Sequence, residues 1–206
     1  MATDACLPVD TACRWFYNRV MIEPGRVTLS DEDTITRSGP ARGRERLSLE
    51  LSVADAAAPE SPACRTVVPS DRDALARLML DAYRGTVDYN GETLGDALKE
   101  VGSTLSGSYG RFLFDCSFVV DGGTELSSAS LVTSFNSGES GERALLAFVM
   151  TAKRHQRQGM AATLVRHSAA ALRGKGYTRL ELVVTTDNAP AKQLYARLGF
   201  RPVQAD

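Results

Sequence analysis

The sequence Ala144-Leu-Leu-Ala-Phe-Val-Met-Thr151, continued by Ala152-Lys-Arg-His-Gln-Arg-Gln158 and Gly159-Met-Ala-Ala-Thr-Leu-Val165, decides the fold. The apolar run predicts a buried strand and the cationic polar segment predicts a turn. The spacing of the next apolar residues predicts an amphipathic helix that starts at Gly159. A strand that turns into a helix in this way directs free backbone N–H groups and the positive end of the helix dipole at one spot. The stretch therefore predicts a phosphate or pyrophosphate site at the start of the helix.

The turn does not match the two best-known phosphate loops. The P-loop pattern is absent, and the dinucleotide fingerprint needs three glycines where this turn has one. The pattern that fits is Gln156-x-x-Gly159-x-Ala161, which resembles the acyl-CoA loop of the GNAT superfamily of N-acetyltransferases. Arg154 and Arg157 flank the turn, where they could pair with further phosphate or be merely solvated.

Length and composition set limits on the function. The chain has 206 residues, of which 43% are apolar and 24% charged, and its net charge is −1. These values suit a globular protein of one domain with an appendage, and they give no reason to expect nucleic acid as a partner. No secretory signal and no membrane-spanning run is visible, so no membrane partner is expected. Four scattered cysteines predict free thiols in the cytoplasm and no metal site.

Residues 1–62 are expected to form an N-terminal β-rich extension, either a small β unit packed on the main domain or a partly ordered tail. The segment 19–29 predicts a hairpin around Pro24-Gly25, and the alternation over 47–53 predicts a half-buried strand. Residues 54–62 are rich in Ala and Pro and predict a linker. Residues 63–206 are then the main domain.

The main domain is expected to have the order β-α-α-β-β-β-α-β-α-β. Strands are predicted over 65–68, 112–120, 126–135, 144–151 and 180–184, with a short last strand from Phe200. Helices are predicted from a cap at Ser70, over 94–105, over 159–173, and from a cap at Asn188 to a stop at Gly199.

A second motif supports the same family. The sequence Leu182-Val-Val-Thr-Thr-Asp-Asn188-Ala-Pro-Ala191-Lys-Gln-Leu194-Tyr195-Ala-Arg-Leu-Gly199-Phe200 resembles the last GNAT motif, which has an Asn, an Ala three residues later, then Leu/Phe-Tyr and Gly-Phe. The two motifs have the order and separation found in the family, and so do the elements from residue 65. The resemblance covers about two-thirds of the chain and implies the GNAT acyl-CoA N-acyltransferase fold, a mixed-sheet α+β fold.

The resemblance implies that acetyl-CoA donates an acetyl group to a primary amine by direct attack in a ternary complex, without a metal. Tyr195 would be the general acid, because a phenol with a pKa of roughly 10 can protonate a thiolate. The backbone of Met150 or Thr151 would polarise the thioester carbonyl. The residues expected to bind acetyl-CoA are Met150, Thr151, Gln156, Arg157, Gln158, Gly159, Met160, Ala161, Ala162 and Asn188.

Simpler roles stay open for several of these residues. Tyr195 could be a core aromatic on an i, i+4 stripe, and Asn188 could be only a helix cap. The general base is not fixed: Glu142 is the nearest carboxylate before the strand, Asp88 and Glu92 are alternatives, and water could serve instead. His155 lies in the predicted phosphate turn and is expected to be a surface or ligand-contact residue, and His167 is expected on the surface of its helix.

The acceptor is expected to be a small-molecule or peptide amine. The segment between the first two predicted helices carries Asp88 and Glu92 beside Tyr83 and Tyr89. Carboxylates attract a cationic amine and aromatic rings add a cation-binding face, so these residues are candidates for acceptor binding. The alternative is a solvated loop.

Two other functions compete with acetyl transfer. A non-catalytic acyl-CoA-binding or regulatory module would keep Gly159 but would not need Tyr195. A nucleotide-binding module is less well supported, because both glycine fingerprints are missing. The oligomeric state is open, with a homodimer as one option.

Overall fold

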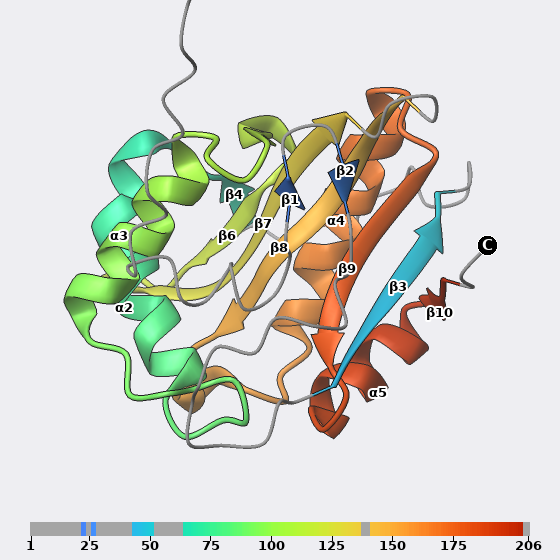
Figure 1. The fold of residues 1–206 in the computed structure, drawn as a ribbon. Coiled ribbons are helices and arrows are strands. Elements are labelled where there is room, and N and C mark those ends of the chain that lie inside the picture. Colours follow the sequence, from blue (N-terminus) through green and yellow to red (C-terminus); the bar gives the residue numbers. More distant parts are fainter. Residues whose placement is uncertain (1–21, 24–25, 28–42, 52–63, 137–140, 204–206) are drawn as a thin grey trace, which may run out of the picture.

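The structure is a computed structural model, and it describes residues 22–23, 26–27, 43–51, 64–136 and 141–203. Within these residues it contains one two-stranded and one eight-stranded sheet and four α-helices (Figure 1). The strands are β1 (Ile22–Glu23), β2 (Arg26–Val27), β3 (Arg44–Glu50), β4 (Cys64–Thr66), β5 (Arg111–Phe112), β6 (Phe118–Asp121), β7 (Leu126–Asn136), β8 (Glu142–Thr151), β9 (Arg179–Thr185) and β10 (Arg201–Pro202). The helices are α2 (Arg72–Tyr83), α3 (Leu94–Leu105), α4 (Met160–Gly174) and α5 (Ala189–Arg197).

The large sheet is mixed. Its strands lie in the order β10-β3-β9-β8-β7-β6-β4, and β5 pairs with β7 beside this path. Neighbours are antiparallel except β8 and β9, which are parallel. The α+β fold that the motifs imply is therefore confirmed.

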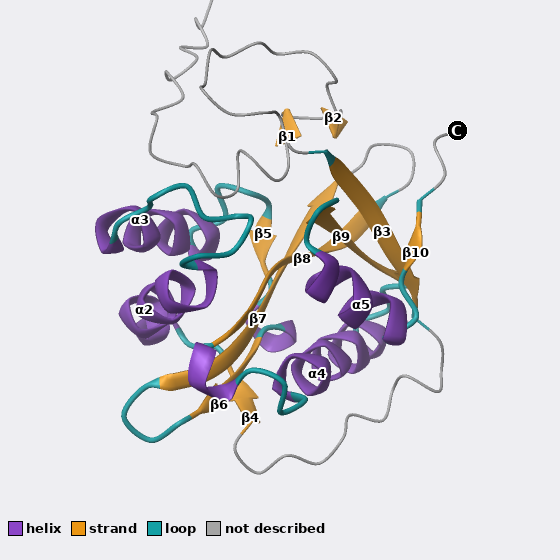
Figure 2. Cartoon of the chain, turned by 90° about the horizontal axis from the view of Figure 1, so that it is seen from below, coloured by secondary structure: helices purple, strands orange, loops and turns teal. Residues whose placement is uncertain are grey.

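Helices cover both faces of this sheet (Figure 2). The helices α2 and α3 lie on one face, and α4 and α5 lie on the other. Two buried apolar clusters fill the spaces between the layers. The first cluster packs α2 and α3 against the sheet and includes Leu75, Val101 and Phe148. The second cluster packs α4 against the other face and includes Val165, Leu172 and Leu182. Burying both faces explains why β8 is apolar on both sides rather than alternating.

Only part of the predicted N-terminal extension lies within the described residues. The strands β1 and β2 pair antiparallel, with Ile22 opposite Val27, as the predicted hairpin requires. The strand expected over 47–53 begins earlier, as β3, and lies between β9 and β10 in the large sheet. The expected linker 54–62 lies outside the described residues, so the domain boundary near residue 62 stays a prediction.

Two predicted boundaries in the main domain are wrong. The strand expected over 112–120 is divided into β5 and β6 by a short 3-10 turn, Phe114–Cys116. The cap expected at Ser70 is also misplaced: a 3-10 turn, Pro69–Asp71, precedes α2, and the Asp71 carboxylate accepts a bond from the Val68 N–H at 2.9 Å. Periodicity does not detect such single turns, because they are shorter than one helical repeat.

The feature that positions the site is the separation of β8 from β9. The two strands pair only at Ala144 with Leu180 and at Leu145 with Glu181, and then diverge toward their carboxyl ends (Figure 1). On its other side β8 stays paired with β7 up to Thr151, with a bulge at Ala147 where the register shifts. A bulge bends a strand and increases its twist, which accounts for β8 turning away from β9.

Candidate active site

The carboxyl end of β8 forms one side of the gap. Ser128 on β7 lies opposite Thr151, and its hydroxyl donates to the Met150 carbonyl at 2.7 Å. The Ser128 and Thr151 hydroxyls are 2.9 Å apart. These bonds hold the last residues of β8 in place although β9 does not pair with them.

The turn after β8 is tightly shaped. Lys153–His155 form a 3-10 turn, and the Lys153 N–H donates to the Asp81 carboxylate of α2 at 2.8 Å. Arg157 has φ 61°, and it is the one non-glycine residue with positive φ in the described part of the chain. Such backbone conformations cost energy and gather at ligand sites.

The cationic side chains of this turn differ in their partners. Arg154 donates to Glu125 at 3.0 Å and to the ring of His155 at 3.0 Å. Arg154 is therefore directed toward the loop before β7. Gln156 donates to the Thr151 carbonyl at 3.4 Å, which ties the turn back to the end of β8.

The start of α4 has the geometry of an anion site. Gly159 is the N-cap with φ 82°, and no side chain caps the helix there. The first helical bond runs from the Thr163 N–H to the Gly159 carbonyl at 3.0 Å, so the N–H groups of Met160, Ala161 and Ala162 lack acceptors within the helix. A Cβ added at Gly159 would meet nothing within 4 Å. Backbone N–H groups beside open space at a helix N-terminus suit a phosphate.

The other side of the gap is the junction of β9 with α5. The Asn188 Oδ1 accepts from the Ala191 N–H at 3.2 Å, which confirms the predicted cap. The Asn188 Nδ2 donates to the Asp88 carboxylate at 2.9 Å, and the Thr185 hydroxyl donates to the same carboxylate. This junction lies at the carboxyl end of β9, as the start of α4 follows the carboxyl end of β8.

Tyr195 lies on α5 and is half-buried. Its ring packs edge-on against the buried Phe200, with 5.5 Å between the ring centroids. The ring is thus held by the second apolar cluster, as the stripe interpretation requires. The ring packing fixes where the phenol hydroxyl lies, and the proton-donor role stays a prediction.

The predicted acceptor residues have separate environments. Tyr83 is buried in the first apolar cluster. Glu92 is 5% exposed and accepts from the Asn90 N–H at 2.7 Å, and the Tyr89 hydroxyl donates to the Glu92 carbonyl at 3.2 Å. Glu92 and Tyr89 therefore stabilise their own loop, whereas Asp88 contacts Thr185 and Asn188 at the β9–α5 junction.

Glu142 lies at the opposite end of β8. At ~3.3 Å per strand residue it is roughly 30 Å from Thr151. Hydrogen bonds from Arg111 and Ser134 outweigh partial burial and hold the pKa of Glu142 below its usual range. The structure does not bring this carboxylate together with the other candidates. Glu142 and Thr151 are the two ends of one extended strand, so residues close in sequence are far apart in space.

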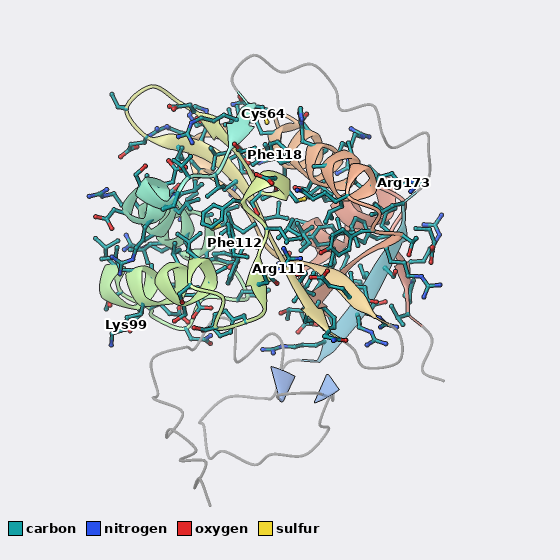
Figure 3. The ribbon with its side chains drawn as sticks, turned by 90° about the horizontal axis from the view of Figure 1, so that it is seen from above. Cys64, Lys99, Arg111, Phe112, Phe118 and Arg173 are labelled. Atoms are coloured by element: carbon teal, nitrogen blue, oxygen red, sulfur yellow. The ribbon has the colours of Figure 1, made fainter. Side chains whose placement is uncertain are left out.

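The two histidines lie on α4 and in the turn that precedes it. His167 on α4 packs against Phe118, which lies beside that helix (Figure 3), with 5.4 Å between ring centroids. Its predicted surface position is therefore only partly right, since the ring is half-buried. His155 is half-buried in the turn after β8 and accepts from Arg154.

Sequence reasoning missed three contacts that build the site. They involve Asp81, Ser128 and Thr185, whose partners are 72, 22 and 97 residues away in the chain. No local pattern encodes such separations.

The described residues contain no group of three or more His, Cys, Asp or Glu side chains that could hold a metal ion. Nor does any helix among them have the length and apolarity needed to cross a membrane.

Comparison with solved structures supports the fold. The chain is 18% identical to a GCN5-related N-acetyltransferase from Sphaerobacter thermophilus, with a TM-score of 0.60 over 79% of this chain and 49% of that one. It is 20% identical to the ribosomal-protein-S18-alanine N-acetyltransferase from Escherichia coli, with a TM-score of 0.53 over 68% and 78% of the two chains. It is 14% identical to an aminoglycoside antibiotic 6′-N-acetyltransferase from Acinetobacter haemolyticus, with a TM-score of 0.52 over 69% and 93%.

These likenesses establish the fold, and the chain spans about half the length of the Sphaerobacter protein. A sequence comparison with curated proteins gives no significant match. The family assignment comes from a family model, that of the acetyltransferase (GNAT) family, which matches residues 106–200. This range contains both motifs, the gap between β8 and β9, and the start of α4. Residues 106–200 therefore belong to the GNAT acetyltransferase family.

Proposed function

We propose that this protein transfers the acetyl group of acetyl-CoA to a primary amine of a small molecule or a peptide. The observation that carries the proposal is the gap between β8 and β9, which opens next to the uncapped start of α4. Acetyl-CoA supplies an acetyl thioester on a long arm that contains amides and ends in a pyrophosphate. Each part of that molecule has a matching feature along the gap.

The pyrophosphate matches the start of α4. The N–H groups of Met160, Ala161 and Ala162 point along the helix axis, and Gly159 leaves space in front of them. The helix dipole adds partial positive charge at the same place. Gln156, Arg157 and Gln158 surround this position as exposed polar residues.

The amide-containing arm matches the unpaired edges of the strands. Backbone groups of Met150 and Thr151 lie on β8 beyond its last pairing with β9, and buried backbone polar groups require partners. An extended chain with amides satisfies such edges in the manner of an added strand. Asn188 can contribute as well, because its amide nitrogen has a second N–H besides the one bound to Asp88.

The proposed proton transfers use the candidate residues that the sequence identifies. Tyr195 is the proposed donor to the departing thiolate. Glu142 is at the far end of β8, Glu92 is bound within its loop, and Asp88 is bound to Thr185 and Asn188. Of the bases that the sequence leaves open, water is the best supported, and the acceptor amine then reacts in its neutral form.

The proposed acceptors include both small-molecule amines and peptide amines. One structural relative is named for an aminoglycoside antibiotic and another for the alanine of a ribosomal protein, so this fold serves both small and protein amines. Fold alone does not choose between them.

A release assay tests the proposal. Purified protein is incubated with acetyl-CoA and a panel of amines, amino acids, aminoglycosides and peptides, and free thiol is measured. Acceptor-dependent thiol release is expected for at least one amine. Tight acetyl-CoA binding with no release for any acceptor would instead favour the non-catalytic acyl-CoA-binding module, and absence of binding would contradict both.

A further inference from the structure

Two aspartates on one segment contact the two sides of the gap. Asp81, near the end of α2, accepts from the Lys153 N–H at 2.8 Å, just after β8. Asp88, in the loop 84–93, accepts from Thr185 and Asn188 at the end of β9. The strands β8 and β9 do not pair there, so α2 and its loop connect what the sheet leaves apart.

The Asp88 contact also determines the orientation of the Asn188 side chain. The Ala191 N–H needs an oxygen as its acceptor, and the Asp88 carboxylate needs a donor. Only one orientation of the amide meets both needs, with Oδ1 on the helix and Nδ2 on the carboxylate. A bond to an ionised acceptor is stronger than a neutral one, so Asp88 fixes the amide more firmly than a neutral partner would.

The loop that carries Asp88 has its own internal support. The Thr86 hydroxyl donates to the Tyr83 carbonyl at 2.8 Å and accepts from the Asp88 N–H at 3.3 Å. The buried Glu92 carboxylate accepts from the Asn90 N–H at 2.7 Å. Asp88 therefore lies in a loop with internal hydrogen bonds, and its own bonds join that loop to the β9–α5 junction.

We propose that Asp88 is a positioning residue that latches the loop 84–93 to the β9–α5 junction and sets Asn188 for acyl-CoA binding. The ligand in this inference rests on the proposed function, whereas the latch itself does not. The inference differs from the expectation that Asp88 attracts the acceptor amine, since both of its carboxylate oxygens already accept bonds from Thr185 and Asn188. Loss of Asp88 should then affect acetyl-CoA rather than the acceptor.

The first experiment compares the full-length wild type with Asp88→Ala and with Asp115→Ala. Asp115 is a suitable control because it is an exposed carboxylate on a distant turn, paired with Lys175 at 2.9 Å. Amide hydrogen exchange of residues 84–93 is measured without ligand, and acetyl-CoA affinity is measured by calorimetry. Asp88→Ala should speed the exchange and weaken acetyl-CoA binding by roughly fivefold or more, the lower range of coupling between sites. Asp115→Ala should change neither.

A swap of the two side chains tests the pairing itself. Asn188→Asp keeps the helix cap, because a carboxylate accepts the Ala191 N–H equally well, but it places two carboxylates together. Adding Asp88→Asn should restore a carboxylate–amide pair with its polarity reversed. The double variant should therefore exchange more slowly over 84–93 and bind acetyl-CoA more tightly than Asn188→Asp alone. Circular dichroism checks that the variants are folded. If Asp88→Ala does not fold, Thr185→Val replaces it, because that variant removes only one of the two bonds to Asp88.

Each outcome decides the inference. Unchanged exchange in Asp88→Ala, or a double variant no better than Asn188→Asp, would overturn the latch. Faster exchange with unchanged acetyl-CoA affinity and a raised KM for the acceptor would overturn the positioning role and assign Asp88 to the acceptor. If the wild type does not bind acetyl-CoA, the proposed function and the positioning role fail together, while the exchange data still decide the latch.

Discussion

Leu145 and Glu181 are the last residues at which β8 and β9 pair. Beyond them β8 continues to Thr151 and β9 to Thr185, and each strand ends beside a helix start, that of α4 and that of α5 respectively. Two helix N-termini and two unpaired strand edges thus converge on one gap. Arg143 precedes the first of these pairs on β8, and its side chain pairs with the buried Glu181 on β9 at 3.1 Å.

Gly159→Ala should weaken acetyl-CoA binding by roughly tenfold, about 1.4 kcal/mol. The new methyl group would occupy the open space before the helix N–H groups. Because φ is 82° at this position, an alanine there also costs about 1–2 kcal/mol of backbone strain. Gly176→Ala is the matched control, since Gly176 has φ 89°, equally open surroundings, and a position beyond the far end of α4. Both variants should lose similar stability, and only the first should lose affinity in calorimetry. Equal affinities would move the phosphate site elsewhere.

Tyr195→Phe should lower kcat on the order of 10²–10⁴-fold, the usual contribution of general acid–base catalysis. The ring contact with Phe200 is kept, so folding and the Kd for acetyl-CoA should change little. Tyr177→Phe is the control, because the Tyr177 hydroxyl bonds to Arg111 and belongs to a different part of the molecule. A Tyr195→Phe enzyme with wild-type kcat would leave Tyr195 as a packing residue.

The pH dependence of kcat/KM should follow the pKa of the acceptor amine. With water as the base, kcat/KM rises with pH as the acceptor amine loses its proton, and it levels off above the amine's own pKa. Acceptors with an α-amino group, of pKa about 8, and with a lysine-type amine, of pKa about 10.4, should therefore give profiles displaced from each other. The same break near pH 4–5 for every acceptor would show that a carboxylate of the enzyme is the base.

Stability should fall at acid pH through Asp71. Burial raises the pKa of this carboxyl, but bonds from Arg65 and from the Val68 N–H, together with the Arg65 charge, outweigh burial and leave it below its usual range. A lowered folded-state pKa means that the contribution is present above the unfolded pKa of about 3.9 and is lost as pH falls through the folded value.

Asp71→Asn should therefore cost on the order of 1–3 kcal/mol at pH 7, as expected when a buried carboxylate paired at 2.8 Å with a partly exposed Arg65 loses its charge. Urea unfolding at pH 7 and pH 3 measures the difference between variant and wild type, which should shrink at pH 3. Asp115→Asn should cost little at either pH, because Asp115 is exposed. A constant difference across pH would mean that the Asp71 charge contributes nothing.

The elements were largely predictable from the sequence, because hydrophobic spacing reports which side of a helix or strand is buried. The helix over 94–105 was predicted with the bounds found, and the cap at Asn188 was identified from Asn followed by Pro190. The order from residue 65 differs by one short strand, because a single 3-10 turn separates β5 from β6. The bulge at Ala147 was not predicted, since it changes pairing without changing composition.

The site was predictable only where a motif is continuous in sequence. Gly159 and Asn188 lie within such motifs and have the backbone and cap geometry expected of them. Glu142 is a candidate base because it is the carboxylate nearest to the predicted strand in sequence, but the two ends of an extended strand are far apart in space. Asp88 was recognised as relevant, yet its partners on β9 and α5 follow from tertiary packing that no spacing rule conveys.

The central claim is that acetyl-CoA lies between β8 and β9 with its pyrophosphate at the start of α4. Amide hydrogen exchange of the full-length protein with and without acetyl-CoA tests this directly. Protection is expected over residues 150–163 and 183–191, with none over 111–121, which includes β5 and β6, the strands that pair with β7. Protection confined to other segments, or none at saturating acetyl-CoA, would contradict the account.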